Sequence, residues 1–187
     1  MNYIFPFTAI VGMDLVKRSL IYHAIDLTLG GLLLMGQRGC AKSTLARSFR
    51  EILPSVSNDQ ETTFVEVPLG TTEDRLLGSI DASRLLADGE WSMQTGLIEQ
   101  ANNGVLYIDE VNLLPDHLVD SILDSAASGQ HRIERDGLSK NVNARYILIG
   151  SMNPEEGDLR PQLTDRFMHG VLVKDDFSVE ERMEIVR

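Results

Sequence analysis

The sequence predicts an α/β fold with a mainly parallel sheet. Three short apolar runs, residues 32–35, 105–108 and 146–149, have the length and composition of strands buried on both faces. Segments with helical spacing of apolar residues lie between these runs, and strands that alternate with helices build parallel sheets. Polar residues with catalytic potential follow each run directly. Because ligands bind at the carboxyl ends of such strands, we expect a single site at that edge of the sheet.

The first half of the chain predicts alternating helices and strands. Residues 14–29 have the spacing of an amphipathic helix that Gly30 and Gly31 end, with an apolar side formed by Leu15, Ile21, Ala24, Ile25 and Leu29. After the run at 32–35 we expect a helix over residues 45–53, a polar loop over 56–62, an alternating strand over 63–67 and a short helix over 72–77. Residues 78–95, which contain the only tryptophan, Trp91, are expected to be irregular and to project from the domain.

The second half continues this pattern. We expect a helix over residues 96–101, a strand over 105–108, a helix over 115–128, a hairpin over 131–140, and strands over 146–149 and 171–173. Pro115 suits the first turn of its helix, Gly129 suits the position after its end, and Asp136-Gly137 is a hairpin signal. Ser178 begins a last helix with a capping box to Glu181. That helix has no stop signal before Arg187, so we expect the chain to be a fragment.

Composition limits the classes of function. The chain has 187 residues, of which 43% are hydrophobic, enough for one domain with a sizeable core. Its net charge of −11 makes it a poor general binder of nucleic acid or of anionic membranes. One cysteine, Cys40, excludes an internal disulfide and fits a reducing compartment. No signal peptide and no run long enough to span a bilayer is visible, so we expect a cytoplasmic protein.

A glycine-containing loop follows the run at 32–35. Gly36 and Gly39 let the backbone turn so that its N–H groups face phosphate oxygens, and the next helix adds its positive dipole end. Lys42 is placed to reach the β- and γ-phosphates, and the Ser43 hydroxyl to ligate Mg²⁺. Ala41 stands where the motif has glycine; its methyl group costs little if φ is negative there, and we interpret it as a tolerated variant. The alternative is a chance glycine-rich turn.

Two carboxylates, Asp109 and Glu110, follow the run at 105–108. Beside a phosphate-binding loop, Asp109 is suited to hold Mg²⁺, directly or through water, and Glu110 to orient and deprotonate an attacking water. The alternative is a solvated acidic turn. Asn153, after the next run, is suited to bond the γ-phosphate or the attacking water, although asparagine before proline is also a common turn.

Arg166 lies in the polar segment that follows Asn153. A guanidinium at this place is suited to stabilise the charge that develops on a transferring phosphoryl group, as an arginine finger does. It is equally suited to an ion pair within the chain, with Asp165 or Asp158. Spacing alone does not choose between these two roles.

With these residues in view, the chain resembles the large α/β subdomain of an AAA+ ATPase, in the clade of magnesium chelatase ATPase subunits and MoxR-type ATPases. The resemblance runs from Phe5 to the end and is most specific at residues 70–78, 105–114, 116–120, 132–139 and 150–167. It implies a P-loop fold whose five-stranded parallel sheet has the order 5-1-4-3-2 and is flanked by helices. It further implies that residues 1–187 are one AAA+ core domain, with a helix-2 insertion at 78–95 and a pre-sensor-1 hairpin at 131–140. On the same resemblance we expect the C-terminal helical lid to be absent from residues 1–187.

The resemblance also implies a set of site residues for ATP and Mg²⁺. Catalytic roles fall to Glu110, Lys42, Asn153 as sensor 1, and Arg166 as a finger that acts in trans on a neighbour's nucleotide. Ser43 and Asp109 are the metal ligands. Nucleotide-binding positions are Ile10, Val11 and Gly12 near the adenine, and Gly36, Gln37, Arg38, Gly39, Cys40, Ala41, Lys42, Ser43 and Thr44 in the Walker A loop.

The implied function is that of an Mg²⁺-dependent ATPase that works as a ring, expected to be a hexamer, and remodels or activates a partner. In the chelatase branch the partners are a von Willebrand-type subunit and a large catalytic subunit that inserts metal into a tetrapyrrole. A MoxR-like chaperone unrelated to tetrapyrroles is the alternative. A nucleotide switch with little turnover, which Glu110 disfavours, and a helicase, which the acidic charge disfavours, are further alternatives.

Overall fold

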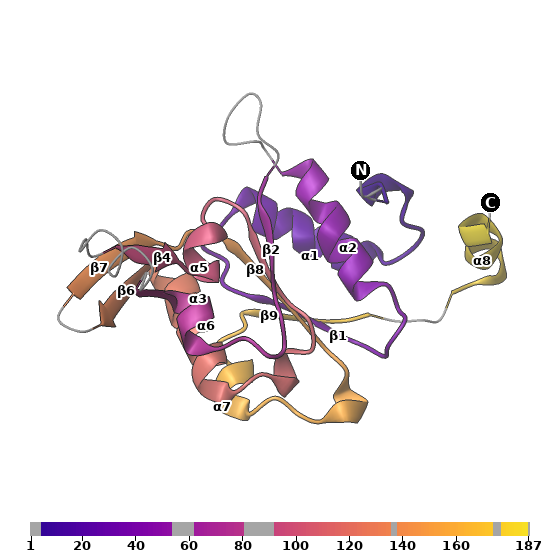
Figure 1. Ribbon diagram of the computed structural model, residues 1–187. Coiled ribbons are helices and arrows are strands. Elements are labelled where there is room, and N and C mark those ends of the chain that lie inside the picture. Colours follow the sequence, from indigo (N-terminus) through magenta and orange to yellow (C-terminus); the bar gives the residue numbers. More distant parts are fainter. Residues whose placement is uncertain (1–4, 54–61, 81–91, 136–137, 174–176, 187) are drawn as a thin grey trace.

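A central parallel sheet organises the protein in the computed structural model, which describes residues 5–53, 62–80, 92–135, 138–173 and 177–186 (Figure 1). Its strands are β1 (Leu32–Met35), β2 (Phe64–Val67), β5 (Val105–Ile108), β8 (Ile147–Met152) and β9 (His169–Leu172). They lie in the order β2-β5-β8-β1-β9, and every neighbouring pair is parallel. Numbered along the chain within this sheet, the order from β9 to β2 reads 5-1-4-3-2. The predicted α/β class is confirmed.

Helices cover both faces of this sheet (Figure 1). One apolar core lies under α1 (Asp14–Ile25) and α2 (Lys42–Phe49), which a 3₁₀ turn, Arg50–Ile52, extends. The other lies under α3 (Glu73–Leu77), α5 (Leu97–Gln100), α6 (Asp116–Ser128) and α7 (Pro161–Thr164). Alternate residues of one strand enter opposite cores, as Leu106 and Tyr107 of β5 do, because side chains alternate across a sheet. The last described helix is α8 (Val179–Val186), and no helix of the described ranges is long and apolar enough to cross a membrane.

The predicted extent and buried face of α1 are both wrong. The helix ends at Ile25 rather than at residue 29, because Asp26 is extended and its carboxylate accepts bonds from the Thr28 amide at 2.8 Å and hydroxyl at 2.6 Å. Leu15 and Ile25 are 66% and 77% exposed. The buried residues are instead Val16, Ser19, Leu20 and His23. Two apolar stripes lie one residue apart on this helix, and only the packing against β1 and β9 decides between them.

Other boundaries differ by a few residues. The helix after the glycine loop begins at Lys42, three residues before the predicted start, and β8 continues to Met152. The expected hairpin is present as β6 (Gln130–Arg135) and β7 (Leu138–Asn143), while its turn at 136–137 lies outside the described residues. Within the segment expected to be irregular, β3 (Gly78–Ile80) pairs antiparallel with β4 (Met93–Thr95). Trp91 lies outside the described residues, as does most of the loop predicted over 56–62.

A buried histidine makes stability depend on pH. His23 of α1 is 2% exposed and lies edge-on to His169 of β9, with ring centroids 5.1 Å apart. Burial lowers the pKa of His23, so below about pH 6.5 the unfolded chain binds a proton that the folded chain excludes. We therefore expect the free energy of unfolding to fall as pH decreases below this value, as measured by urea denaturation at several pH values. His23→Leu should flatten that slope, whereas a slope unchanged in His23→Leu but lost in His117→Gln, at an exposed position, would contradict the assignment.

Candidate functional site

The glycine loop joins the carboxyl end of β1 to α2 and lies against the neighbouring edge of the sheet. A Cβ on Gly36 would meet the Val173 carbonyl oxygen at 2.7 Å, so only glycine permits this close approach. Gly39 has a φ of +82°, which also favours glycine. The loop backbone is thus fixed by packing on one side and by glycine torsions in the middle, with the N-terminus of α2 at its end.

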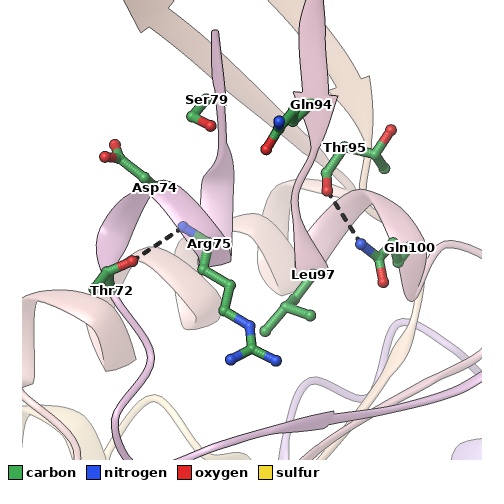
Figure 2. Close-up of a pocket in the computed structure, with 8 residues that line it drawn as sticks. All are labelled: Thr72, Asp74, Arg75, Ser79, Gln94, Thr95, Leu97 and Gln100. Carbon is green, nitrogen blue, oxygen red and sulfur yellow. Dashed lines mark hydrogen bonds between the residues drawn. The ribbon is translucent and has the colours of Figure 1, made fainter. Parts of the chain in front are cut away.

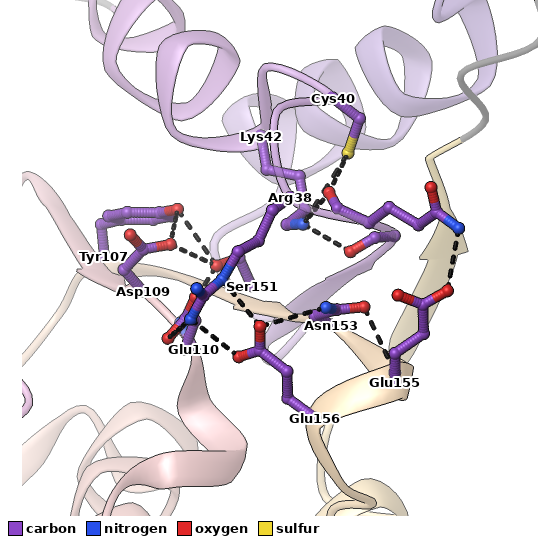
Figure 3. Close-up of polar contacts among 12 residues, drawn as sticks. Arg38, Cys40, Lys42, Tyr107, Asp109, Glu110, Ser151, Asn153, Glu155 and Glu156 are labelled. Carbon is purple, nitrogen blue, oxygen red and sulfur yellow. Dashed lines mark hydrogen bonds and ion pairs between the residues drawn. The ribbon is translucent and has the colours of Figure 1, made fainter.

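Lys42 brings a buried positive charge to the centre of this loop (Figure 3). Its ammonium group donates to the Gly36 carbonyl at 2.5 Å and the Gln37 carbonyl at 2.8 Å, and lies 3.7 Å from the Cys40 sulfur. The residue is 9% exposed. No carboxylate of the described residues pairs with it, and a buried charge is costly without an opposite charge. An anion that enters the loop would supply that charge.

Ala41 has a φ of +62°, so the condition under which its methyl group would cost little is not met. This residue directly precedes α2 in the left-handed region, where its Cβ is strained by about 1–2 kcal/mol. The motif has glycine at this position because the turn into the helix requires that conformation. The chain therefore keeps the geometry of the loop at a cost in local strain.

Ala41→Gly is expected to stabilise the protein. Relief of the strain is partly offset by the greater freedom of glycine in the unfolded chain, about 0.4–1 kcal/mol, so we expect a net gain of up to about 1 kcal/mol in the free energy of unfolding. Ala46→Gly, in the interior of the same helix, is the matched control and should lose about 1 kcal/mol or more. Urea denaturation measures both, and a loss of stability in Ala41→Gly would contradict the argument.

The acidic pair stands at the end of β5 and is held by hydroxyl groups. Asp109 Oδ1 accepts hydrogen bonds from the Tyr107 hydroxyl at 2.8 Å and the Ser151 hydroxyl at 2.7 Å. Burial raises the pKa of Tyr107, which keeps its hydroxyl protonated as a donor. Glu110 has a φ of +56°, and its N–H donates to the Ser151 hydroxyl at 3.2 Å. The two carboxylates are therefore ordered parts of the structure rather than a solvated turn.

Arg38 links the loop to this acidic pair. Its guanidinium lies 3.1 Å from Glu110 Oε1 and 2.7 Å from Glu156 Oε1, and Glu110 is the main cause of a raised pKa of Arg38. A second link joins the Gln37 amide to Glu155 at 2.9 Å. These contacts bring the end of β1, the end of β5 and the segment after β8 together, as the parallel sheet predicts.

Asn153 is placed beside the acidic pair and is 4% exposed. Its amide donates to Glu156 Oε1 at 3.2 Å, and its side-chain oxygen accepts from the Glu155 amide at 3.2 Å, which caps the 3₁₀ turn Pro154–Glu156. The turn role is therefore present. It does not exclude the second role, because the side chain stands among the groups that face the loop.

Arg166 is not part of this cluster. It forms ion pairs with Asp120, at 2.5 Å, and with Asp124, both on α6, rather than with Asp165 or Asp158. The predicted adenine segment, Ile10, Val11 and Gly12, is also set apart from the acidic pair. Ile10 packs in the core that contains Cys40, and a Cβ on Gly12 would lie 3.0 Å from Glu181 of α8.

The profile of the family described as AAA domain (dynein-related subfamily) matches residues 31–167, which contain the loop, the acidic pair, Asn153 and Arg166. The chain belongs to this AAA family. The resemblance seen in the sequence is thereby confirmed at the level of the family.

Three known proteins are similar to this chain over most of its length. It is 48% identical over 194 residues to magnesium-chelatase subunit ChlI of Olisthodiscus luteus, covering 92% of this chain and 58% of that protein. It is 49% identical to an uncharacterized protein of Mycobacterium tuberculosis, covering 98% of this chain and 29% of that protein. A solved structure of the complex between BchI and BchD of magnesium chelatase, based on single-particle cryo-EM, matches with a TM-score of 0.84 and 43% identity, covering 98% of this chain and 65% of that one. The chain thus spans less than two thirds of each of these three proteins.

The donor groups of the site suit Mg²⁺ that is shared with a bound phosphate, rather than a metal ion that only protein side chains hold. In the described ranges no group of three or more histidine, cysteine or carboxylate side chains could hold a metal ion. Magnesium prefers oxygen ligands and is commonly bound by one or two carboxylates together with the phosphates of a substrate. Asp109 and the hydroxyl of Ser43, the second residue of α2, are of this kind. The structure therefore suits a magnesium ion that arrives with a nucleotide.

Sequence reasoning missed several residues of the site: Tyr107, Ser151, Glu155 and Glu156. Tyr107 lies two residues before Asp109, and Ser151 two residues before Asn153, so the alternation of each strand could have placed them on one side of the sheet.

A polar cavity of about 400 Å³ beside β3 and β4 is separate from this site (Figure 2). None of the predicted site residues lines it; its lining is Thr72, Asp74, Arg75, Ser79, Gln94, Thr95, Leu97 and Gln100.

Proposed function

We propose that this protein binds ATP with Mg²⁺ and hydrolyses it as an AAA+ motor of the magnesium-chelatase type. The observation that carries the proposal is the buried Lys42 ammonium, which has no carboxylate partner among the described residues and sits in a glycine loop whose Arg38 contacts Glu110. A triphosphate supplies the missing negative charge. Residues 1–187 then act as one AAA+ core domain.

The chemistry assigns a role to each group. The loop N–H groups and the N-terminus of α2 would bind phosphate oxygens, and Lys42 would turn from the loop carbonyls to the β- and γ-phosphates. Ser43 and Asp109 would hold Mg²⁺, which when bound neutralises phosphate charge. Glu110 would accept a proton from water attacking in line with the β–γ bond, and Asn153 would orient that water or the γ-phosphate.

Arg166 supplies the last charge from a neighbouring subunit. Within its own chain it points to α6 rather than to the loop, so its natural target is a nucleotide held by the next copy. This requires a ring, which we propose is a hexamer. Ile10, Val11 and Gly12 would lie near the adenine, as in the family that the chain resembles.

The names of the relatives support a proposal for the partners. The chelatase names of the similar proteins favour the chelatase branch, in which a von Willebrand-type subunit and a large catalytic subunit complete the enzyme and insert metal into a tetrapyrrole. The alternative is a MoxR-like chaperone that acts with a von Willebrand-type partner. We propose a cytoplasmic location and no role for nucleic acid or membrane, consistent with the net charge of −11.

Reconstitution tests this function. The full-length protein is mixed with a von Willebrand-type subunit and a large catalytic subunit encoded beside it, and ATP-dependent insertion of Mg²⁺ into a porphyrin is followed by fluorescence. We expect insertion with the wild type and none with Lys42→Ala. ATP hydrolysis without insertion would favour the MoxR-like alternative, and absence of both would overturn the proposal.

A further inference from the structure

We propose that Tyr107 and Ser151 are positioning residues, whose hydroxyl groups bind one oxygen of Asp109 so that the other is presented to Mg²⁺. This inference rests on the proposed function. Tyr107 lies on β5 and Ser151 on the neighbouring parallel strand β8, and both are fully buried. They reach the same acceptor, Asp109 Oδ1, at 2.8 and 2.7 Å.

The distances favour one arrangement of the hydroxyl protons. Each hydroxyl has one proton to donate, and the short distances to Asp109 Oδ1 assign both protons to this oxygen. The Tyr107 oxygen also lies 3.2 Å from Ser151 Oγ, the weaker of its two contacts. Asp109 Oδ2 has no hydrogen-bond partner among the described residues. One carboxylate oxygen is therefore bound by the protein, and the other is left for a ligand.

Ser151 also connects the two carboxylates. While its proton goes to Asp109, its oxygen accepts the N–H of Glu110 at 3.2 Å. Glu110 has a left-handed φ of +56°, which a non-glycine residue adopts only when its surroundings fix it. The Ser151 hydroxyl thus holds both the carboxylate suited to the metal and the backbone of the proposed base. Its loss should therefore weaken metal binding and also lower ATP turnover.

Elsewhere in the same protein a second buried tyrosine–serine pair provides a matched control. The Tyr146 hydroxyl lies 2.6 Å from Ser125 Oγ and 2.9 Å from the Ile122 carbonyl, and both residues are buried. This pair joins the start of β8 to α6, away from the acidic pair. Tyr146→Phe and Ser125→Ala therefore remove hydroxyls of the same kind and burial without touching Asp109.

The test follows binding of a fluorescent ATP analogue to the full-length protein as Mg²⁺ is added. In Tyr107→Phe and Ser151→Ala we expect the Mg²⁺ concentration for half-maximal tightening to rise about 10- to 100-fold, while binding in EDTA stays at the wild-type level. Ser151→Thr keeps the hydroxyl and should stay near the wild type. Tyr146→Phe and Ser125→Ala should leave the Mg²⁺ titration unchanged, whatever their thermal stability.

The outcomes of this titration distinguish failure of the positioning role from failure of the proposed function. Suppose that Mg²⁺ tightens nucleotide binding by the wild type, and that Tyr107→Phe and Ser151→Ala need the same Mg²⁺ concentration for this effect. The positioning role is then overturned while the proposed function stands. If nucleotide binding by the wild type does not change when Mg²⁺ is added, both the positioning role and the proposed function are overturned. Tyr107→Phe removes a single oxygen from the protein, so it keeps the test decisive if Ser151→Ala does not fold.

Discussion

Arg166→Ala in the full-length protein is expected to lower ATP turnover about 10³-fold or more, with nucleotide binding retained. An arginine finger stabilises charge that exists only in the transition state, so its loss affects turnover rather than binding. The in-chain partners, Asp120 and Asp124, are half-exposed or more, and loss of such exposed pairs costs only about 0–1 kcal/mol of stability each. A phosphate-release assay and a nucleotide titration measure the two quantities.

Arg160→Ala is the matched control for Arg166→Ala. Arg160 precedes α7 and also pairs with an acid of α6, Asp116, at 2.5 Å, so the variant removes a comparable ion pair. It should turn over ATP close to the wild-type rate. Loss of activity in Arg160→Ala with full activity in Arg166→Ala would move the finger to Arg160, and full activity in both would contradict a finger in this segment.

Glu110→Gln is expected to lower turnover about 10²- to 10⁴-fold, the usual contribution of a general base, while ATP binds as before. Glutamine keeps the size and the hydrogen bond to Arg38 but cannot accept the proton of the attacking water. Steady-state phosphate release, with ATP affinity measured separately, checks this. Equal rates in wild type and variant would indicate a nucleotide switch rather than a motor.

Mixing the two variants tests the action in trans. In a ring, some interfaces would combine Glu110 of an Arg166→Ala subunit with Arg166 of a Glu110→Gln subunit, and these interfaces should hydrolyse ATP. The mixture is therefore expected to exceed the activity of either variant alone. If mixing restores nothing although the subunits assemble together, base and finger act within one chain.

The parallel sheet and the glycine loop could be predicted because both depend on local signals. Apolar runs of strand length fixed β1, β5 and β8, and the carboxyl-end rule placed Glu110 and Asn153 beside the loop. The left-handed conformation of Ala41 could not be predicted from residue type, since alanine normally avoids it. The signal lies in the motif itself, which has glycine at this position.

Features that depend on tertiary packing could not be predicted. The buried face of α1 follows from which stripe meets β9, and the stripe with Ser19 and His23 is the more polar of the two. Arg166 pairs with acidic residues of α6 that lie more than 40 residues away in sequence, so its partners could not be predicted from neighbouring positions. The hydroxyls of Tyr107 and Ser151 likewise meet Asp109 only because β5 and β8 are neighbours.

The most direct measurement is a crystal structure of the wild-type protein with Mg²⁺ and a non-hydrolysable ATP analogue. Our account predicts the β- and γ-phosphates within hydrogen-bond distance of the Lys42 ammonium, and the metal bound by Ser43 with Asp109 Oδ2 directed to it. A triphosphate bound elsewhere, or one in the loop with Asp109 turned away from its metal, would contradict the account.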